Sequence, residues 1–210
     1  MGRARTGIIT IILITTAALA LAGAPLRADA PHPHLPAPAV TGDERVDLAP
    51  LRDLYLQSVR DSRAIAKGME EIERVRARAA VQAGTPLDAT LTAYRGALVT
   101  LRAKHAFWPA QKLRFLREGL AILDATIAAH PEHAEARYLR LMSCYYLPGI
   151  LGRGGSVRED FAALARLLPL VRAQYPPPLY DAIARFVVER GRLPAAERQA
   201  LEATLKRADA

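Results

Sequence analysis

Residues 113–148, LRFLREGLAILDATIAAHPEHAEARYLRLMSCYYLP, decide the fold that we expect for this chain. Their first half carries two neighbouring apolar stripes at spacings of three and four, the pattern of a helix that packs on two sides. The stripes are Leu113, Leu116, Leu120, Leu123 and Ile127, and Phe115, Gly119, Ile122 and Thr126. Pro131 disfavours helical geometry at His130, so this helix should end there and a second should cover residues 134–147.

The same stretch resembles a tetratricopeptide repeat. Four residues match the small, large, small and proline positions of that family's second helix: Gly119, Leu123, Thr126 and Pro131. Residues 87–105 supply the first helix, but residues 106–109 make its connection longer than in the family, and Arg137 and Arg140 replace an expected aromatic residue and leucine. The resemblance covers roughly a third of the chain and implies stacked helical hairpins that bind a protein or peptide.

A second, shorter resemblance concerns the RYLR sequence at residues 137–140. Together with the Leu-Pro and Leu-Gly pairs at residues 147–148 and 151–152, it is similar to a motif of an uncharacterised family of exported bacterial helical proteins. That motif implies no particular activity.

The first thirty residues have the composition of a secretory signal peptide. Arg3 and Arg5 precede an uncharged apolar run over residues 7–22, and Ala-Asp-Ala at residues 28–30 offers a small-x-small cleavage site. The run is short for a membrane span, which needs about 20 residues, although an uncleaved anchor is the alternative. We expect export, to the periplasm of a Gram-negative cell or otherwise to the medium, with the mature chain starting near Pro31.

The remainder of the chain predicts an all-α protein. Residues 31–48 contain four prolines and no apolar periodicity, as in an extended tether. Residues 49–210 carry helical periodicity almost throughout, and we expect seven or eight helices in antiparallel pairs, a tetratricopeptide-like α-solenoid or bundle. Ser156 and Glu159 fit a capping box that opens one helix, and Pro169 should kink or split it.

Positive charge is concentrated in one part of the sequence. The chain has a formal charge of +8, and removal of residues 1–30 takes away three arginines and one aspartate, which leaves +6. No acidic residue occurs between Ala89 and Arg117, a segment whose cations are Arg95, Arg102, Lys104, Lys112, Arg114 and Arg117. Phe107 and Trp108 lie beside them and add aromatic contact area, a combination suited to carboxylate or phosphate groups.

We therefore expect a protein-binding module or scaffold that recognises an acidic or carboxylate-bearing partner. The predicted partner-binding residues are Arg95, Arg102, Trp108, Arg114, Arg117, Arg137 and Arg140. A protein or acidic peptide is the expected partner, an anionic envelope polymer or lipid is an alternative, and export argues against nucleic acid. In a second interpretation the arginines only solvate a helix face, and the sequence leaves the oligomeric state open.

Arg137 and Arg140 have two interpretations because they replace core residues on an otherwise apolar helix. In one, they form a buried ion pair with a carboxylate such as Asp124 or Asp160. In the other, they line a concave groove and grip the carboxylate of a bound peptide.

Other classes of function have weaker support in the sequence. A cell-envelope enzyme that cleaves glycans needs paired carboxylates, and Glu118 and Asp124 stand six apart on one helix, so they point in different directions. This enzyme and a self-associating structural subunit remain alternatives, and we assign no catalytic residue. Cys144 lies among apolar residues and should be buried and inert. His130 and His133 supply only two ligands, so no metal or cofactor is predicted.

Overall fold

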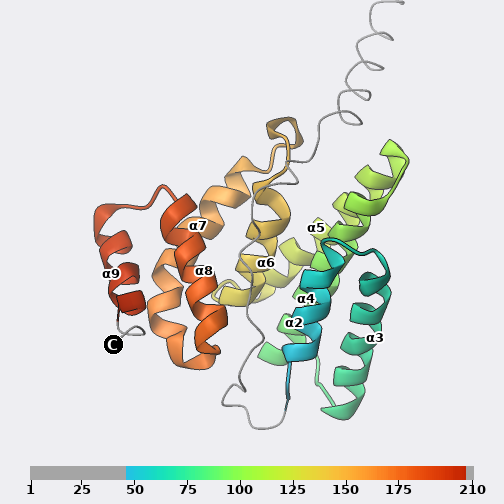
Figure 1. Ribbon diagram of the computed structural model, residues 1–210, viewed down its shortest axis with the longest axis horizontal. Coiled ribbons are helices and arrows are strands. Elements are labelled where there is room, and N and C mark those ends of the chain that lie inside the picture. The colour runs from blue at the N-terminus through green and yellow to red at the C-terminus, as the bar shows by residue number, and fades with distance from the viewer. Residues whose placement is uncertain (1–45, 207–210) are drawn as a thin grey trace, which may run out of the picture.

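The computed structural model describes residues 46–206, and this part of the chain contains α-helices, two short 3-10 helices and no strand (Figure 1). The elements are α2 (Ala49–Ser58), α3 (Arg63–Arg78), α4 (Pro86–His105), α5 (Pro109–Ala129), α6 (Ala134–Tyr145), η1 (Gly149–Leu151), α7 (Gly154–Val171), η2 (Arg172–Gln174), α8 (Pro177–Arg190) and α9 (Ala195–Lys206). The all-α prediction is confirmed. The predicted signal peptide at residues 1–30 and most of the tether at residues 31–48 lie outside the described residues.

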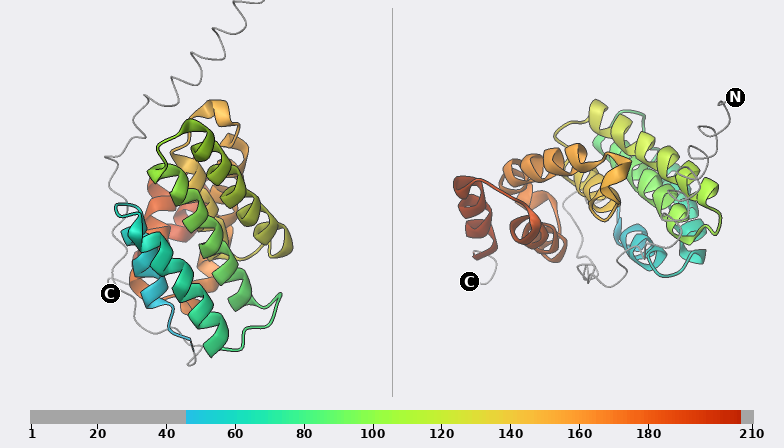
Figure 2. Two further views of the ribbon diagram at one scale, coloured as in Figure 1. Left: turned by 90° about the vertical axis from the view of Figure 1, so that its right-hand side faces the viewer. Right: turned by 90° about the horizontal axis from the view of Figure 1, so that it is seen from above.

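The helices form consecutive hairpins: α2 with α3, α4 with α5, α6 with α7, and α8 with α9. The second helix of each of the first three hairpins also packs on the first helix of the next, and α4 contacts both α2 and α6. Seen from above, the hairpins follow one another along an arc (Figure 2). The connection inside each hairpin lies at the upper end of that hairpin in Figure 1.

Helix α6 joins the two halves of the core. Ala136, Leu139 and Cys144 pack with buried residues of α2 to α5, whereas Tyr138 and Leu141 pack with those of α7, α8 and α9. A helix that is buried on opposite sides is held by both neighbours, as the apolar pattern of this segment predicts. Within residues 46–206, no helix is both long and apolar enough to cross a lipid bilayer.

The predicted break at Pro131 is confirmed, and local hydrogen bonds explain it. Helix α5 ends at Ala129, with His130 as its C-cap residue. Helix α6 restarts at Ala134, where the Nδ1 atom of His133 accepts a hydrogen bond from the backbone N–H of Ala136 at 3.3 Å. The side chain at this N-cap position therefore satisfies one of the donors that a helix start leaves free.

Two predictions about α7 are corrected by the structure. The helix begins at Gly154, so Ser156 lies inside its first turn and does not form a capping box with Glu159. Glu159 instead accepts hydrogen bonds from Arg137 and Arg140. Pro169 does not split the helix, because α7 continues to Val171 and then tightens into η2, and the alternative of a kink stays a prediction.

Helices α4 and α5 cross in close contact at Gly96 and Gly119. A Cβ atom on Gly119 would lie 2.6 Å from the carbonyl oxygen of Gly96 and 2.6 Å from the backbone nitrogen of Thr100. Only glycine fits such a backbone contact without displacing the helices. Because this crossing sets the distance between α4 and α5, it also sets the distance between the exposed side chains of the two helices.

Candidate functional site

Four of the predicted site residues are exposed on the second hairpin. Arg95 and Arg102 project from α4, Arg114 and Arg117 project from α5, and all four side chains are exposed. We call these four residues the basic face. The left-hand view of Figure 2 shows α4 between α3 and α5.

The two exposed arginines of α4 share one side of the helix. Arg95 and Arg102 stand seven residues apart, and seven residues make two turns of an α-helix. Leu91 and Leu98 are buried, and each precedes one of these arginines by four residues, so the arginines lie beside the buried stripe and not opposite it. Their exposure therefore depends on how the neighbouring helices pack around α4.

Phe115 brings the cations of the two helices together. The guanidinium carbon of Arg114 lies 4.9 Å from the centre of the Phe115 ring, and that of Arg102 lies 5.9 Å from it. Both distances fall within the range of cation–π attraction. One aromatic ring thus contacts a guanidinium group from each of the two helices, and no hydrogen bond within the described residues engages the N–H donors of either group.

No ion pair neutralises this group. Among residues 46–206, ion pairs involve Arg52, Arg74, Arg76, Arg137, Arg140 and Arg153, and none involves a residue of the basic face. The lack of acidic residues between Ala89 and Arg117 accounts for this. None of the four arginines of the basic face therefore has an ion-pair partner within residues 46–206, and the first acidic residue after them in the sequence is the exposed Glu118, one turn after Arg114 on α5.

Trp108 lies at the end of the same hairpin, in the connection between α4 and α5. Phe107 and Trp108 are 82% and 62% exposed, and their rings meet edge to face with centres 5.1 Å apart. The connection is braced, because the Nε2–H group of His105 donates a hydrogen bond of 2.7 Å to the carbonyl oxygen of Ser58. Pro109 then fixes the first turn of α5.

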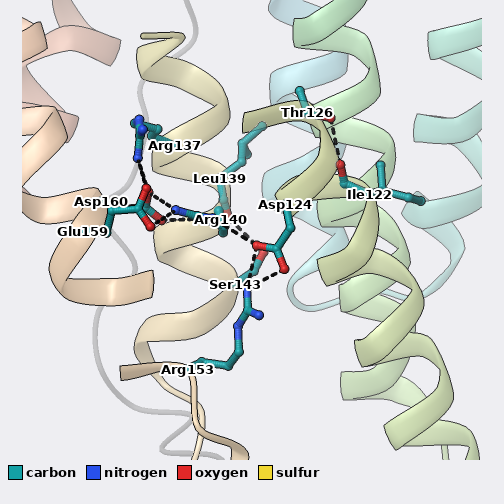
Figure 3. A network of polar contacts seen from close by, with 10 residues as sticks. All are labelled: Ile122, Asp124, Thr126, Arg137, Leu139, Arg140, Ser143, Arg153, Glu159 and Asp160. Atoms are coloured by element: carbon teal, nitrogen blue, oxygen red, sulfur yellow. Dashed lines mark hydrogen bonds and ion pairs between the residues drawn. The ribbon is translucent and has the colours of Figure 1, made fainter. Parts of the chain in front are cut away.

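Arg137 and Arg140 do not belong to this surface, which corrects the predicted site. Both are buried on α6, and their guanidinium groups point at carboxylates of α5 and α7 (Figure 3). This is the ion-pair arrangement with Asp124 and Asp160 that was the alternative for these two arginines. Their donors are engaged inside the protein, so they are not available to grip a bound peptide.

Asp160 is the centre of this buried network. Its side chain is fully buried, and it accepts hydrogen bonds from Arg140 at 2.7 and 2.8 Å and from Arg137 at 3.0 Å. Arg140 also donates to Asp124 at 3.0 Å, and Arg153 donates to the same carboxylate at 2.8 Å. With Glu159, three arginines and three carboxylates connect α5, α6 and α7 and carry no formal net charge.

The contacts of Asp124 in this network can be compared with the alternative of an enzyme that uses Glu118 and Asp124 as acid and base. Burial alone would raise the pKa of Asp124, but hydrogen bonds from Arg153 and Arg140 outweigh it and lower that pKa. A carboxyl group that donates a proton near neutral pH needs a raised pKa instead. Glu118 is exposed on the outer side of α5, so the two carboxyl groups do not form a paired acid and base.

A second buried ion pair, between Arg52 and Glu135, was not predicted from the sequence. Arg52 of α2 donates to the Glu135 carboxylate at 2.9 and 3.0 Å, and the Tyr94 hydroxyl donates to it at 2.6 Å. This contact joins the first helices of three hairpins. The 83 residues that separate Arg52 from Glu135 leave no local pattern by which the pair could be recognised.

The Glu135 contact predicts a dependence of stability on pH. Burial opposes the charged form, yet the charge of Arg52 and hydrogen bonds from Arg52 and Tyr94 outweigh it, so the pKa of Glu135 in the folded protein lies below 4.5. Its stabilising effect should be complete above pH 4.5 and be lost as the pH falls through the lowered pKa, because protonation removes the charge that Arg52 and Tyr94 stabilise.

Urea denaturation at a series of pH values checks this prediction. Between pH 7 and acidic pH, the unmodified protein should lose more unfolding free energy than Glu135→Gln, because the variant has no carboxyl group to protonate at this position. Equal losses in the two proteins would show that Glu135 does not titrate with a lowered pKa.

Neither Cys144 nor the two histidines near Pro131 provide a chemical site. Cys144 is buried, and burial raises the pKa of its thiol. His130 caps the end of α5 and His133 the start of α6, where its Nε2 atom also lies 3.0 Å from the Thr90 hydroxyl. Within residues 46–206, no three histidine, cysteine, aspartate or glutamate side chains are arranged to hold a metal ion.

The fold and the exposed charges define an all-α protein of stacked helical hairpins with a basic face on the second hairpin. Comparison with protein-family models, curated proteins and solved structures finds no match to this chain.

Proposed function

We propose that this protein is an exported helical binding module that holds an acidic or carboxylate-bearing protein or peptide on its basic face. The observation that carries the proposal is the group of exposed arginines, Arg95, Arg102, Arg114 and Arg117, which have no acidic partner within the described residues. Export is inferred from the composition of residues 1–30, and the tetratricopeptide-like sequence of residues 113–148 agrees with a role in binding.

The chemistry of the basic face suits carboxylates in particular. Each guanidinium group offers a planar fork of donors that matches the two oxygens of a carboxylate. Phe115 holds the forks of Arg102 and Arg114 in place before a partner arrives, which reduces the entropy lost on binding. Trp108 adds exposed apolar area at the end of the hairpin. The arginines then supply orientation and association rate, and apolar contacts supply much of the affinity.

An affinity capture from the envelope of the producing cell tests this proposal. The bait is the protein itself, compared with Arg95→Glu, Arg102→Glu, Arg114→Glu. A matched control carries Arg78→Glu, Arg166→Glu, Arg192→Glu, three exposed arginines elsewhere on the molecule, so that both variants have the same net charge.

We expect the unmodified protein and the control to retain an acidic protein at low salt and to release it at high salt, since salt screens exposed charges. The basic-face variant should retain at most about a tenth as much. Equal retention by all three proteins, or loss of retention in both variants, would contradict a specific role for the basic face.

A further inference from the structure

Strongly exposed apolar side chains gather at one end of the helical stack. Four large ones are exposed among the described residues: Phe107, Trp108, Ile150 and Leu170. Phe107 and Trp108 lie in the connection between α4 and α5, and Ile150, 76% exposed, lies in η1 between α6 and α7. Figure 1 and the left-hand view of Figure 2 place these two connections at the same upper end. Leu170 lies near the other end of α7.

This grouping follows from the topology of the fold. In a row of antiparallel hairpins, the connections inside successive hairpins lie along one edge. Side chains on the connections of different hairpins can therefore contact the same flat surface. We call the edge made by Arg60, Lys104, Phe107, Trp108, Lys112 and Ile150 the connection edge.

Cations lie near the apolar residues of the connection between α4 and α5. Arg60 follows α2 and Lys104 lies in the last turn of α4, and these two cations are close enough that Arg60, after burial, contributes to lowering the pKa of Lys104. Lys112 lies in the first turn of α5. Asp61 is the acidic residue beside Arg60, and its carboxylate already accepts a hydrogen bond from the backbone N–H of Arg63 at 2.9 Å. Two like charges held close together repel each other, and a negatively charged partner reduces this repulsion.

We infer that the connection edge docks onto an anionic lipid bilayer, with Phe107, Trp108 and Ile150 entering the headgroup region and the cations contacting lipid phosphates. Tryptophan is favoured at the interface between lipid and water, where its ring meets both environments. Exposed apolar side chains together with lysine and arginine are the pattern of proteins that lie on a membrane surface. Each cation near an anionic surface strengthens binding about fivefold.

The geometry favours a bilayer over a protein as the occupant of this edge. The apolar residues stand on separate connections that share one end, as contact with an extended flat surface requires. The aromatic pair is also held rigidly, because Pro109 and the His105–Ser58 hydrogen bond fix the connection. This inference does not rest on the arginines of the basic face, and Trp108 is the residue that the two proposals share.

Trp108 is the single tryptophan of the chain, so its fluorescence reports directly on the connection edge. The test uses the intact chain with vesicles of phosphatidylcholine, with and without phosphatidylglycerol, that contain brominated lipid to quench tryptophan. Attachment through the apolar run at residues 7–22 would not by itself bring Trp108 against lipid. Quenching of Trp108 therefore reports contact between lipid and the connection edge itself. A control protein carries Trp108→Phe and Leu170→Trp, which moves the reporter to a position that is 78% exposed, near the C-terminal end of α7.

We expect a blue shift and strong quenching of Trp108 on vesicles with phosphatidylglycerol and little of either on phosphatidylcholine alone or in the control protein. Lys112→Gln should weaken the response about fivefold, and Arg95→Glu, on the basic face, should weaken it less. Equal quenching of the two reporters, or no quenching on anionic vesicles, would overturn the inference. A Trp108 response to soluble oligoglutamate but not to vesicles would also overturn it, and would assign the edge to an acidic protein instead.

Discussion

Asp160→Ala is expected to lower the free energy of unfolding by about 3–5 kcal/mol. Asp160 is fully buried and accepts hydrogen bonds from both Arg137 and Arg140. Removing the carboxylate leaves two guanidinium groups buried without this partner, and the cost of an uncompensated buried charge exceeds that of a lost surface contact. Chemical denaturation followed by circular dichroism measures the change.

Glu159→Ala provides the matched control for this prediction. Glu159 contacts the same two arginines, but its side chain is 54% exposed. An exposed ion pair contributes about 1 kcal/mol or less, so this neighbouring variant should remain close to the unmodified protein. If Asp160→Ala and Glu159→Ala have the same small effect, the buried network does not hold α6 to α7 in the way that the structure indicates.

Gly119→Val is expected to have the second largest effect, a loss of about 3 kcal/mol. The added side chain would meet backbone atoms of Gly96 and Thr100 at 2.6 Å, and helix backbone cannot move aside as the end of a flexible side chain can. The helices α4 and α5 must therefore separate, which loosens the core around Leu123. The shift of the thermal midpoint measures the effect.

Ala125→Val controls for the lower helix propensity of valine. Ala125 lies on α5 and is exposed, so valine there costs only the propensity difference, about 0.6 kcal/mol. Similar midpoints for the two variants would mean that α4 and α5 do not cross at the glycines. The same crossing positions the basic face, so Gly119→Val should also weaken partner binding.

Local sequence signals predicted the helices well because their causes are local. Pro131 ends α5 at the residue before it, and Pro86 and Pro109 stand in the first turns of α4 and α5. The apolar stripes of residues 113–127 predicted a helix packed on two sides, and Leu120, Leu123 and Ile127 are buried in the core. The all-α class therefore follows from periodicity and proline placement.

Contacts between residues far apart in the sequence could not be predicted in this way. Glu135 looked like an ordinary residue at a helix start, yet it forms a buried pair with Arg52. Gly96 gave no signal of its own, although it meets the recognised Gly119. The capping box at Ser156 failed because α7 begins two residues earlier, at Gly154, and the side chain of Glu159 pairs with Arg137 and Arg140 of another helix.

The predicted site residues differ in the same way: some follow from the local sequence, and others depend on contacts between distant helices. Exposure of Arg114 and Arg117 follows from helical spacing, since both lie outside the two apolar stripes of α5, whereas Arg95 and Arg102 stand beside the buried Leu91 and Leu98 and are exposed only because no helix covers that side of α4. The burial of Arg137 and Arg140 depends on α7, whose Asp160 supplies the partner. Arginines on an apolar helix thus point to a partner within the fold.

The most direct test of the basic face is the salt dependence of its affinity for a defined acidic probe. Fluorescence anisotropy of a labelled oligoglutamate peptide should give an affinity for the unmodified protein that falls steeply as salt rises. The variant Arg95→Glu, Arg102→Glu, Arg114→Glu should bind at least about tenfold more weakly at low salt, and the control Arg78→Glu, Arg166→Glu, Arg192→Glu much less so. Equal weakening in both variants would show that net charge alone attracts the peptide, and would contradict a binding site on α4 and α5.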